Sequence, residues 1–169
     1  MSGFLAIFST RPHRERQGEE EVALHDLQAR APYGFRMLRD QNYFLAQSAP
    51  SEGRSGPLEE SKSGLLILQD CHFTNAPELR VRLDLDSTAG SETIIAASYE
   101  RWGDLCVAEL DGDFSFLVID RKRRRAFGAR DHFGVKPFYY VDTGHCFLFA
   151  SEIKALASHV LRHYQLDLA

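Results

Sequence analysis

The sequence predicts an α+β fold in which stacked β-sheets are covered by helices. Residues Phe114–Ile119 are apolar at almost every position, so both faces of this strand would be buried. A strand that is buried on both sides lies inside a layered structure, not at the surface of a one-sided sheet. Strand patterns occupy both ends of the chain, and helical patterns lie between them.

The first elements are a strand and a helix. Gly3–Phe8 is an apolar run that predicts a strand, and the polar residues from Arg11 to Gly18 predict a break after it. Glu19–Arg30 has apolar residues at helical spacing and acidic side chains in the first turn, which favour a helix start. The helix is expected to end at Ala31–Gly34.

A strand pair is expected next, at Phe35–Leu38 and Tyr43–Ala46, with a turn at Asp40–Asn42. Ser48–Gly64 is rich in Ser, Gly, Glu and Pro, which predicts a long polar loop. Leu65–Leu68 then predicts a short buried strand.

The remaining chain predicts two helices, four strands and a last short helix. Ala76–Leu83 is a short helix, and Ser91 is expected to cap a longer one that ends before Gly103. Ser151–Glu152 is expected to cap the final helix. The four strands are Phe114–Ile119, Ala126–Ala129, Pro137–Val141 and Cys146–Ala150.

Composition limits the class of protein. The chain has 169 residues, of which 44% are apolar and 26% charged, so residues 1–169 are expected to form a single globular domain. The net charge of −4 argues against non-specific binding to nucleic acid or anionic membranes. No apolar run approaches the roughly 18–20 residues that a membrane span needs.

Cysteine usage points to a reducing compartment. Cys71, Cys106 and Cys146 are an odd number, lie far apart and form no CxxC pair, so no zinc or other metal site is expected. We therefore expect a cytoplasmic protein. The basic run Arg121–Arg125 lies between two strands and is interpreted as a solvated turn, with a nucleic-acid patch as the alternative.

Three separated blocks carry a resemblance to a known family. They are Leu110–Phe116, Ala129–Tyr140 and Phe149–Leu156, and Asn75–Arg80 and Tyr99–Gly103 match further upstream. Together they resemble the amino-terminal domain of the asparagine synthetase family, which is a class II glutamine amidotransferase domain. The resemblance implies a four-layer αββα sandwich of two mainly antiparallel sheets, of the N-terminal-nucleophile hydrolase type.

The resemblance also implies a catalytic site, from which this sequence departs. In the family, a cysteine exposed by removal of Met1 attacks the side-chain amide of glutamine, and its own α-amino group serves as the base. Ser2 occupies that nucleophile position. The family's Arg-Gly-Pro-Asp segment is replaced by Arg30–Tyr33. Three substrate-binding positions differ as well. The arginine that binds the carboxylate of glutamine aligns with Ala49, and the oxyanion segment aligns with Asp70 and Cys71. The aspartate that binds the ammonium group of glutamine aligns with Ser91.

The retained residues are expected to be structural or to form an interface. They are Arg130, Asp131, Phe133, Gly134, Pro137, Tyr140, Ser151 and Glu152. Because glutamine-specific residues are lost while these persist, we expect a scaffold or docking domain of an amide-forming enzyme, without glutamine hydrolysis. Its partner would be an ATP-dependent synthetase domain, on the same full-length protein or a neighbouring chain, as in asparagine synthetases, β-lactam synthetases and lasso-peptide cyclases.

The chain itself is expected to need no cofactor, since ATP and magnesium would bind only in the synthetase domain, which this chain lacks. A homodimer is compatible with these features. Two alternatives remain open. Ser2 could be the nucleophile of an amidohydrolase acting on another amide, or the chain could be an ordinary glutamine amidotransferase with substitutes for the missing residues. In the simplest view, Ser2 is only the small residue that usually follows Met1.

Overall fold

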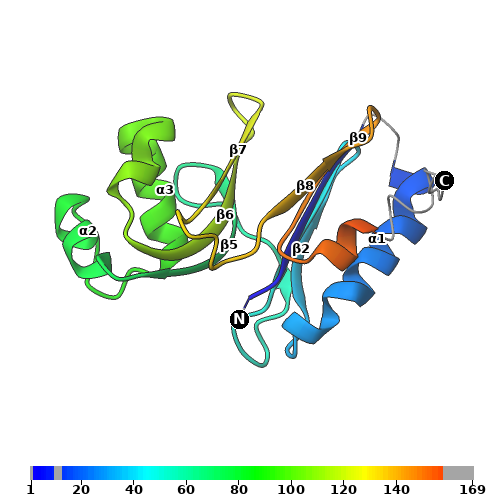
Figure 1. Cartoon of the computed structure of the whole chain (residues 1–169), viewed down its shortest axis with the longest axis horizontal. Helices are drawn as coiled ribbons and strands as arrows, with labels where there is room; N and C mark the ends of the chain where they lie inside the picture. The colour runs from blue at the N-terminus through cyan, green and yellow to red at the C-terminus, as the bar shows by residue number, and fades with distance from the viewer. Residues whose placement is uncertain (1, 10–12, 158–169) are drawn as a thin grey trace. The chain divides into compact units, whose positions relative to one another are not determined.

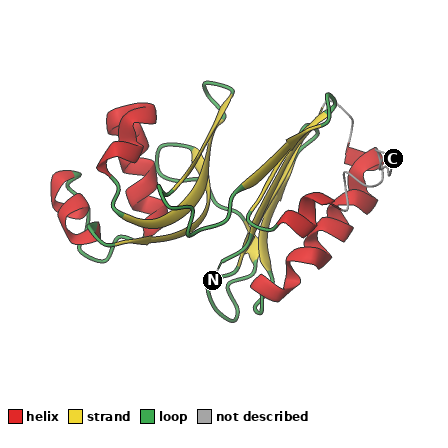
Figure 2. Cartoon of the chain, in the orientation of Figure 1, coloured by secondary structure: helices red, strands yellow, loops and turns green. Residues whose placement is uncertain are grey.

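The structure is a computed structural model that describes residues 2–9 and 13–157, and the chain divides into two compact units (Figure 1). The first unit comprises Met1–Leu58 and Phe138–Ala169, and the second comprises Glu59–Pro137. Each unit has a β-sheet with helices on one face (Figure 2). The predicted α+β architecture with two mainly antiparallel sheets is therefore confirmed.

The first unit has a six-stranded sheet with the order β4-β2-β3-β1-β9-β8. All neighbours pair antiparallel except β2 and β4, which pair parallel. Helix α1 (His13–Leu27) covers one face and continues as a 3₁₀ turn, Gln28–Arg30. The strands are β1 (Phe4–Ser9), β2 (Phe35–Arg39), β3 (Tyr43–Ser48), β4 (Gly56–Pro57), β8 (Tyr139–Asp142) and β9 (Cys146–Ala150).

The core of this unit lies between its sheet and α1. Leu5 and Ile7 on β1 and Leu148 on β9 pack in one cluster with Ala23 and Leu27 of the helix. Ala23 and Leu27 are four residues apart and therefore share one helical face. Complete burial of a Leu or Ile side chain contributes about 1.5–3 kcal/mol, so this face holds the helix on the sheet.

Helix α1 begins at His13, well before the predicted start at Glu19. The predicted break from Arg11 to Gly18 is therefore wrong from His13 onward, and Arg11 itself lies outside the described residues. This segment has no apolar stripe, but Arg, Glu and Gln have high intrinsic helix propensity. The helix ends as predicted, immediately before Ala31–Gly34.

The second unit has a three-stranded antiparallel sheet with the order β5-β6-β7. Strand β6 is buried continuously from Phe114 to Asp120, which confirms the prediction of a strand buried on both faces. Its elements are β5 (Leu65–Phe73), α2 (Ala76–Arg82), α3 (Ser91–Trp102), the 3₁₀ helix η2 (Gly103–Glu109), β6 (Gly112–Asp120) and β7 (Arg125–Arg130).

The two faces of this sheet are distinguished by residue alternation along its strands. Ile67 on β5 and Phe116 on β6 belong to a core cluster with Ile94 and Tyr99 of α3. Side chains at alternate positions of a strand point to opposite faces, so Leu66 and its neighbours two residues away occupy the face opposite α3.

Several element boundaries differ from the predictions. Strand β5 continues to Phe73 instead of ending at Leu68, because its whole length pairs with β6. Ser48 belongs to β3, and the predicted loop after it contains the short strand β4. Gly90, not Ser91, is the N-cap of α3, so Ser91 is the first helical residue. Residues 153–157 are helical after Ser151–Glu152, as expected.

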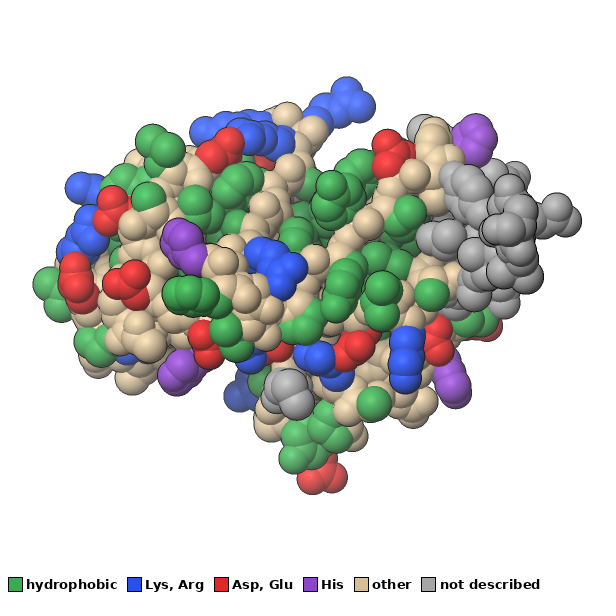
Figure 3. All heavy atoms as spheres, viewed as in Figure 1, with side chains coloured by type: hydrophobic (Ala, Val, Ile, Leu, Met, Phe, Trp, Pro, Cys, Tyr) green, Lys and Arg blue, Asp and Glu red, His purple; other side chains and the backbone are tan. Residues whose placement is uncertain are grey.

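The basic run forms the turn of the β6–β7 hairpin, as predicted. Arg121, Arg123 and Arg125 each pair with a carboxylate of the same unit, namely Glu60, Asp120 and Asp104. Figure 3 shows Lys and Arg side chains gathered around this turn. Within residues 2–9 and 13–157, no helix is long and apolar enough to cross a membrane.

Gly112 provides a test of the second unit's packing. Its φ is +131°, and a Cβ atom there would lie 2.2 Å from the backbone oxygen of His72. We predict that Gly112→Ala lowers the free energy of unfolding by about 3 kcal/mol or more, because it combines backbone strain with a clash against main chain. Gly90→Ala is the control, since no atom lies within 4 Å of its Cβ position. Equal urea midpoints for the two variants would contradict this packing.

Candidate functional site

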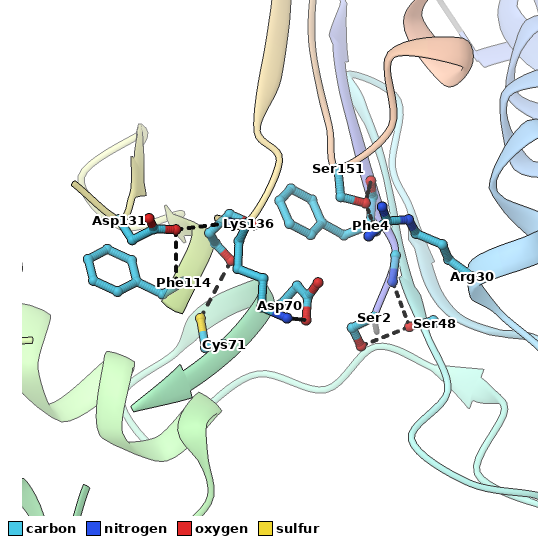
Figure 4. A network of polar contacts seen from close by, with 12 residues as sticks. Ser2, Phe4, Arg30, Ser48, Asp70, Cys71, Phe114, Asp131, Lys136 and Ser151 are labelled. Atoms are coloured by element: carbon cyan, nitrogen blue, oxygen red, sulfur yellow. Dashed lines mark hydrogen bonds and ion pairs between the residues drawn. The ribbon is translucent and has the colours of Figure 1, made fainter. Parts of the chain in front are cut away.

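Ser2 lies in a hydrogen-bonded network at the start of β1 (Figure 4). Its Oγ is 3.0 Å from the Oγ of Ser48 on β3, and Gln47 Nε2 donates to it over 3.3 Å. Ser48 Oγ also accepts from the backbone amide of Gly3 at 3.0 Å. The hydroxyl at the predicted nucleophile position is thus held by two polar side chains of the neighbouring strand.

The segment that follows Ser2 is fixed by Ser151 and Glu152, which precede the helical residues 153–157. Ser151, which is fully buried, accepts the backbone amide of Phe4 on its Oγ at 2.9 Å, and its own amide donates to the Phe4 carbonyl at 3.1 Å. Arg30 forms an ion pair with Glu152. A Cβ on Gly3 would lie 2.9 Å from the Cβ of Arg30, so this close approach requires glycine. Ser151 and Glu152 thus contact the residues that border β1, and their structural role stays a prediction.

Ala49 directly follows the serine that contacts Ser2. Its side chain is only 6% exposed, and its backbone amide donates to the Gly34 carbonyl at 2.8 Å. A methyl group carries no charge and donates no hydrogen bond. Ala49, which is predicted to align with the family's clamp arginine, therefore cannot bind a carboxylate through its side chain.

Asp70 on β5 forms an ion pair with Lys136 in the second unit (Figure 4). Lys136 Nζ lies 3.0 Å from Asp70 Oδ1, and the two side chains are 18% and 7% exposed. Asp70 is opposite Ser115 in the β5–β6 ladder, on the sheet face away from α3. Asp70, which is predicted to align with the family's oxyanion asparagine, is therefore a carboxylate whose charge is compensated by the largely buried ammonium of Lys136.

The loop that carries Lys136 is held by the carboxylate of Asp131. Its oxygens accept the backbone amides of Phe133, Val135 and Lys136 at 2.9–3.1 Å and that of Phe114 at 3.3 Å. Burial raises the pKa of the Asp131 carboxyl, but the amide hydrogen bonds outweigh it and hold the pKa below its usual value. The carboxylate thus stays ionised and fixes the loop.

Cys71 lies beside Asp70 in the sequence but points to the opposite face of the sheet. It packs against the core cluster that includes α3, and its Sγ is 3.5 Å from the backbone oxygen of Ser115. Burial raises the pKa of the Cys71 thiol far above its usual value. Since the thiolate is the reactive form of cysteine, Cys71 is not an activated nucleophile.

The remaining predicted positions are distributed over the second unit and over strand β8 of the first. Ser91 is at the start of α3, and Arg130 ends β7. Phe133 and Tyr140 are strongly exposed, at 95% and 68%, so neither lies in a core, and their interface role stays a prediction. Among the described residues, no group of three or more His, Cys, Asp or Glu side chains is arranged to hold a metal ion.

A family model described as "Glutamine amidotransferase domain" matches residues 45–158, which is more than half of the chain. The chain belongs to this glutamine amidotransferase domain family. The matched range extends across both compact units.

Two relatives of this glutamine amidotransferase domain are named asparagine synthetases. The chain is 45% identical over 82 residues to asparagine synthetase [glutamine-hydrolyzing] 3 of Bacillus subtilis, covering 48% of the chain and 13% of the relative. It is 27% identical over 167 residues to asparagine synthetase [glutamine-hydrolyzing] 1 of the same organism, covering 92% and 26%. The chain thus spans about a quarter or less of the length of these relatives.

A solved structure shares the fold at low sequence identity. Glutamine phosphoribosylpyrophosphate amidotransferase from B. subtilis, complexed with ADP and GMP, has a TM-score of 0.68 and 16% identity. The match covers 92% of this chain and 43% of that one. It supports the N-terminal-nucleophile hydrolase fold expected from the sequence.

Sequence reasoning missed the partners of the predicted positions in this amidotransferase domain. It did not pair Lys136 with Asp70, although Lys136 is a single cation in an otherwise uncharged stretch from Phe133 to Tyr140. It also missed Gln47 and Ser48 as neighbours of Ser2. An antiparallel pairing of the first strand with Tyr43–Ser48 would have placed them there, and the register indeed sets Phe4 opposite Gln47.

The ion pair at Asp70 can be tested by stability measurements. We predict that Lys136→Met lowers the free energy of unfolding by about 3–5 kcal/mol, because it leaves a buried carboxylate without its counter-charge. Adding Asp70→Asn should recover much of that loss in urea titrations. Lys62→Met, at an exposed lysine, is the matched control and should change little. If Lys136→Met and Asp70→Asn changed the free energy of unfolding additively, the ion pair would be contradicted.

The thiols can be tested by alkylation at pH 8. Burial raises the pKa of Cys106 to about 11, and that of Cys71 also lies above its usual value. We predict that iodoacetamide labels both residues at least about 100-fold more slowly in the native protein than in urea, as measured by mass spectrometry. Rapid labelling of native Cys71 would show an accessible, ionisable thiol and contradict its assignment to the core.

Proposed function

We propose that this glutamine amidotransferase domain does not hydrolyse glutamine and serves as a scaffold for an ATP-dependent synthetase domain. The observation that supports this most strongly is the ion pair of Asp70 with Lys136. Hydrolysis of an amide develops negative charge on the carbonyl oxygen, which the family stabilises with an asparagine side chain and a backbone amide. A carboxylate at the asparagine position accepts hydrogen bonds and donates none.

The expected rate losses and lost contact energies support the proposed absence of glutamine hydrolysis. Removal of one oxyanion donor typically lowers the rate by about 10²–10³. The clamp position Ala49 and the ammonium position Ser91 carry no charge, which removes two charge-assisted contacts of roughly 1.5–3 kcal/mol each. Ser2 also supplies a hydroxyl where the family has a thiol, and a serine needs an adjacent base to become a nucleophile.

The proposed partner is an ATP-dependent synthetase domain, on the same full-length protein or on another chain. Both curated relatives are far longer than this chain, and their names describe asparagine synthetases. ATP and magnesium would bind in that domain, and residues 1–169 would act as one domain without a cofactor. The acceptor and product could be those of an asparagine synthetase, β-lactam synthetase or lasso-peptide cyclase.

A second candidate function is an amidohydrolase that uses Ser2. It is supported by the hydrogen bonds of Ser2 Oγ to Ser48 and Gln47, which hold the hydroxyl in place once Met1 is removed. Acylation of Ser2 distinguishes the amidohydrolase from the scaffold. An amidohydrolase would form an ester on Ser2 with an amide substrate, detectable by mass spectrometry and lost in Ser2→Ala.

The proposal predicts that Ser2→Cys alone does not create glutaminase activity. We expect ammonia release from glutamine to remain at least about 10³-fold below that of asparagine synthetase [glutamine-hydrolyzing] 3 of B. subtilis, because the oxyanion and clamp positions stay altered. Ser2→Ala gives the background in the same coupled assay. Ammonia release by the unaltered chain above that background, or its appearance in Ser2→Cys, would overturn the scaffold proposal.

A further inference from the structure

The hydroxyl of Ser2 has neighbours whose hydrogen-bonding roles follow from their chemistry (Figure 4). The backbone amide of Gly3 can only donate, so Ser48 Oγ accepts from it at 3.0 Å. Gln47 Nε2 can also only donate, and it lies 3.3 Å from Ser2 Oγ and 3.4 Å from the carbonyl oxygen of Gly3. That carbonyl can only accept, which keeps the NH₂ end of the Gln47 amide on this side. Ser2 Oγ therefore accepts a hydrogen bond from Gln47.

The contact between the two hydroxyls is best satisfied when Ser48 donates. Their oxygens are 3.0 Å apart, and either could be the donor. Ser48 is only 4% exposed, so its proton needs an acceptor inside the protein. Among the described residues, Ser2 Oγ is the acceptor that lies within hydrogen-bond distance of it. Ser2 is only half-buried, so its own proton can reach solvent instead.

In this arrangement the oxygen of Ser2 accepts two hydrogen bonds while its proton stays available. Removal of Met1 would place the α-amino group on Ser2 itself, and such a group has an ordinary pKa of about 7.7–8.0. The neutral amine is a base within reach of the hydroxyl. Two donors aimed at the oxygen favour its charged form as the proton leaves, because hydrogen bonds to the charged form stabilise it. The two side chains of β3 therefore promote the nucleophilic form of Ser2.

We propose that Gln47 and Ser48 are the positioning residues of Ser2, which accepts an acyl group from an ester or from an amide other than glutamine. Ser2 Oγ forms a bond to the carbonyl carbon, and the bond from that carbon to the alcohol or amine breaks. The Ser2 proton passes to the α-amino group and then to the leaving group, and water hydrolyses the ester on Ser2. This inference rests on the second candidate function and deepens it, because it names the residues on which the reactivity of Ser2 depends.

Ser151 provides a matched control for Ser48. Both serines are buried, and each accepts a backbone amide at the start of β1, from Gly3 at 3.0 Å and from Phe4 at 2.9 Å. Of the two, only Ser48 contacts the hydroxyl of Ser2. Loss of either side chain therefore removes an acceptor that fixes the strand, whereas loss of Ser48 also removes a donor to the nucleophile.

The test uses the chain without Met1, as checked by intact mass, and 4-nitrophenyl acetate as the acyl donor at pH 8. Release of 4-nitrophenolate gives the rate, mass spectrometry locates the acetyl group, and Ser2→Ala gives the background from amines. We expect Ser48→Ala and Gln47→Met to slow acetylation of Ser2 about 10-fold or more, the loss expected for one hydrogen bond to a charged group. Ser48→Thr, which keeps the hydroxyl, and Ser151→Ala should stay within about threefold of the unaltered chain.

The direction of the hydrogen bond between the serines decides the outcome. Unchanged or faster acetylation in Ser48→Ala would show that Ser48 accepts the Ser2 proton and would overturn the inference, while the second candidate function would stand. Equal losses in Ser48→Ala and Ser151→Ala would overturn it as well, since Ser48 would then act only through the strand. No acetyl group on Ser2 of the unaltered chain would contradict the second candidate function together with the inference. Glutamine hydrolysis is decided separately by the ammonia assay.

Discussion

The buried carboxylate of Asp131 is the interaction on which the second unit's functional features depend. It accepts hydrogen bonds from the amide of Phe114 on β6 and from three amides of the loop of residues 132–136. One side chain thus joins the central strand of the sheet to this loop. Buried backbone amides require such partners. Because Lys136 is the last residue of this turn, its approach to Asp70 and the exposure of Phe133 both follow from that carboxylate.

The ion pair of Asp70 with Lys136 connects the stability of the second unit to the proposed loss of glutaminase activity. A pair buried this deeply is costly to break, since either partner alone would leave a charge with little solvent. The aspartate is thus a poor residue for stabilising an oxyanion but a good partner for the lysine. A fold can retain its strands and loops while the chemistry of one position changes, because function belongs to the site and not to the fold.

Much of the fold followed from the sequence, and the exceptions have physical causes. The strand Phe114–Ile119 and the helix end before Ala31 were predictable from apolar continuity and from stop signals. The start of α1 was not, because residues from His13 onward have helix propensity without an apolar stripe. The full length of β5 depends on its pairing with β6, a long-range contact that no local pattern contains.

The sequence named candidate positions in each unit but not the contacts that they make. Alignment with the family blocks identified Ser2 and Asp70, whereas Ser48 and Lys136 became visible as partners only in the structure. The central claim is that the glutamine-specific contacts are gone. Isothermal titration of the purified chain with L-glutamine tests it most directly. We expect no saturable heat at millimolar glutamine, and saturable binding with a stoichiometry of one would contradict the account.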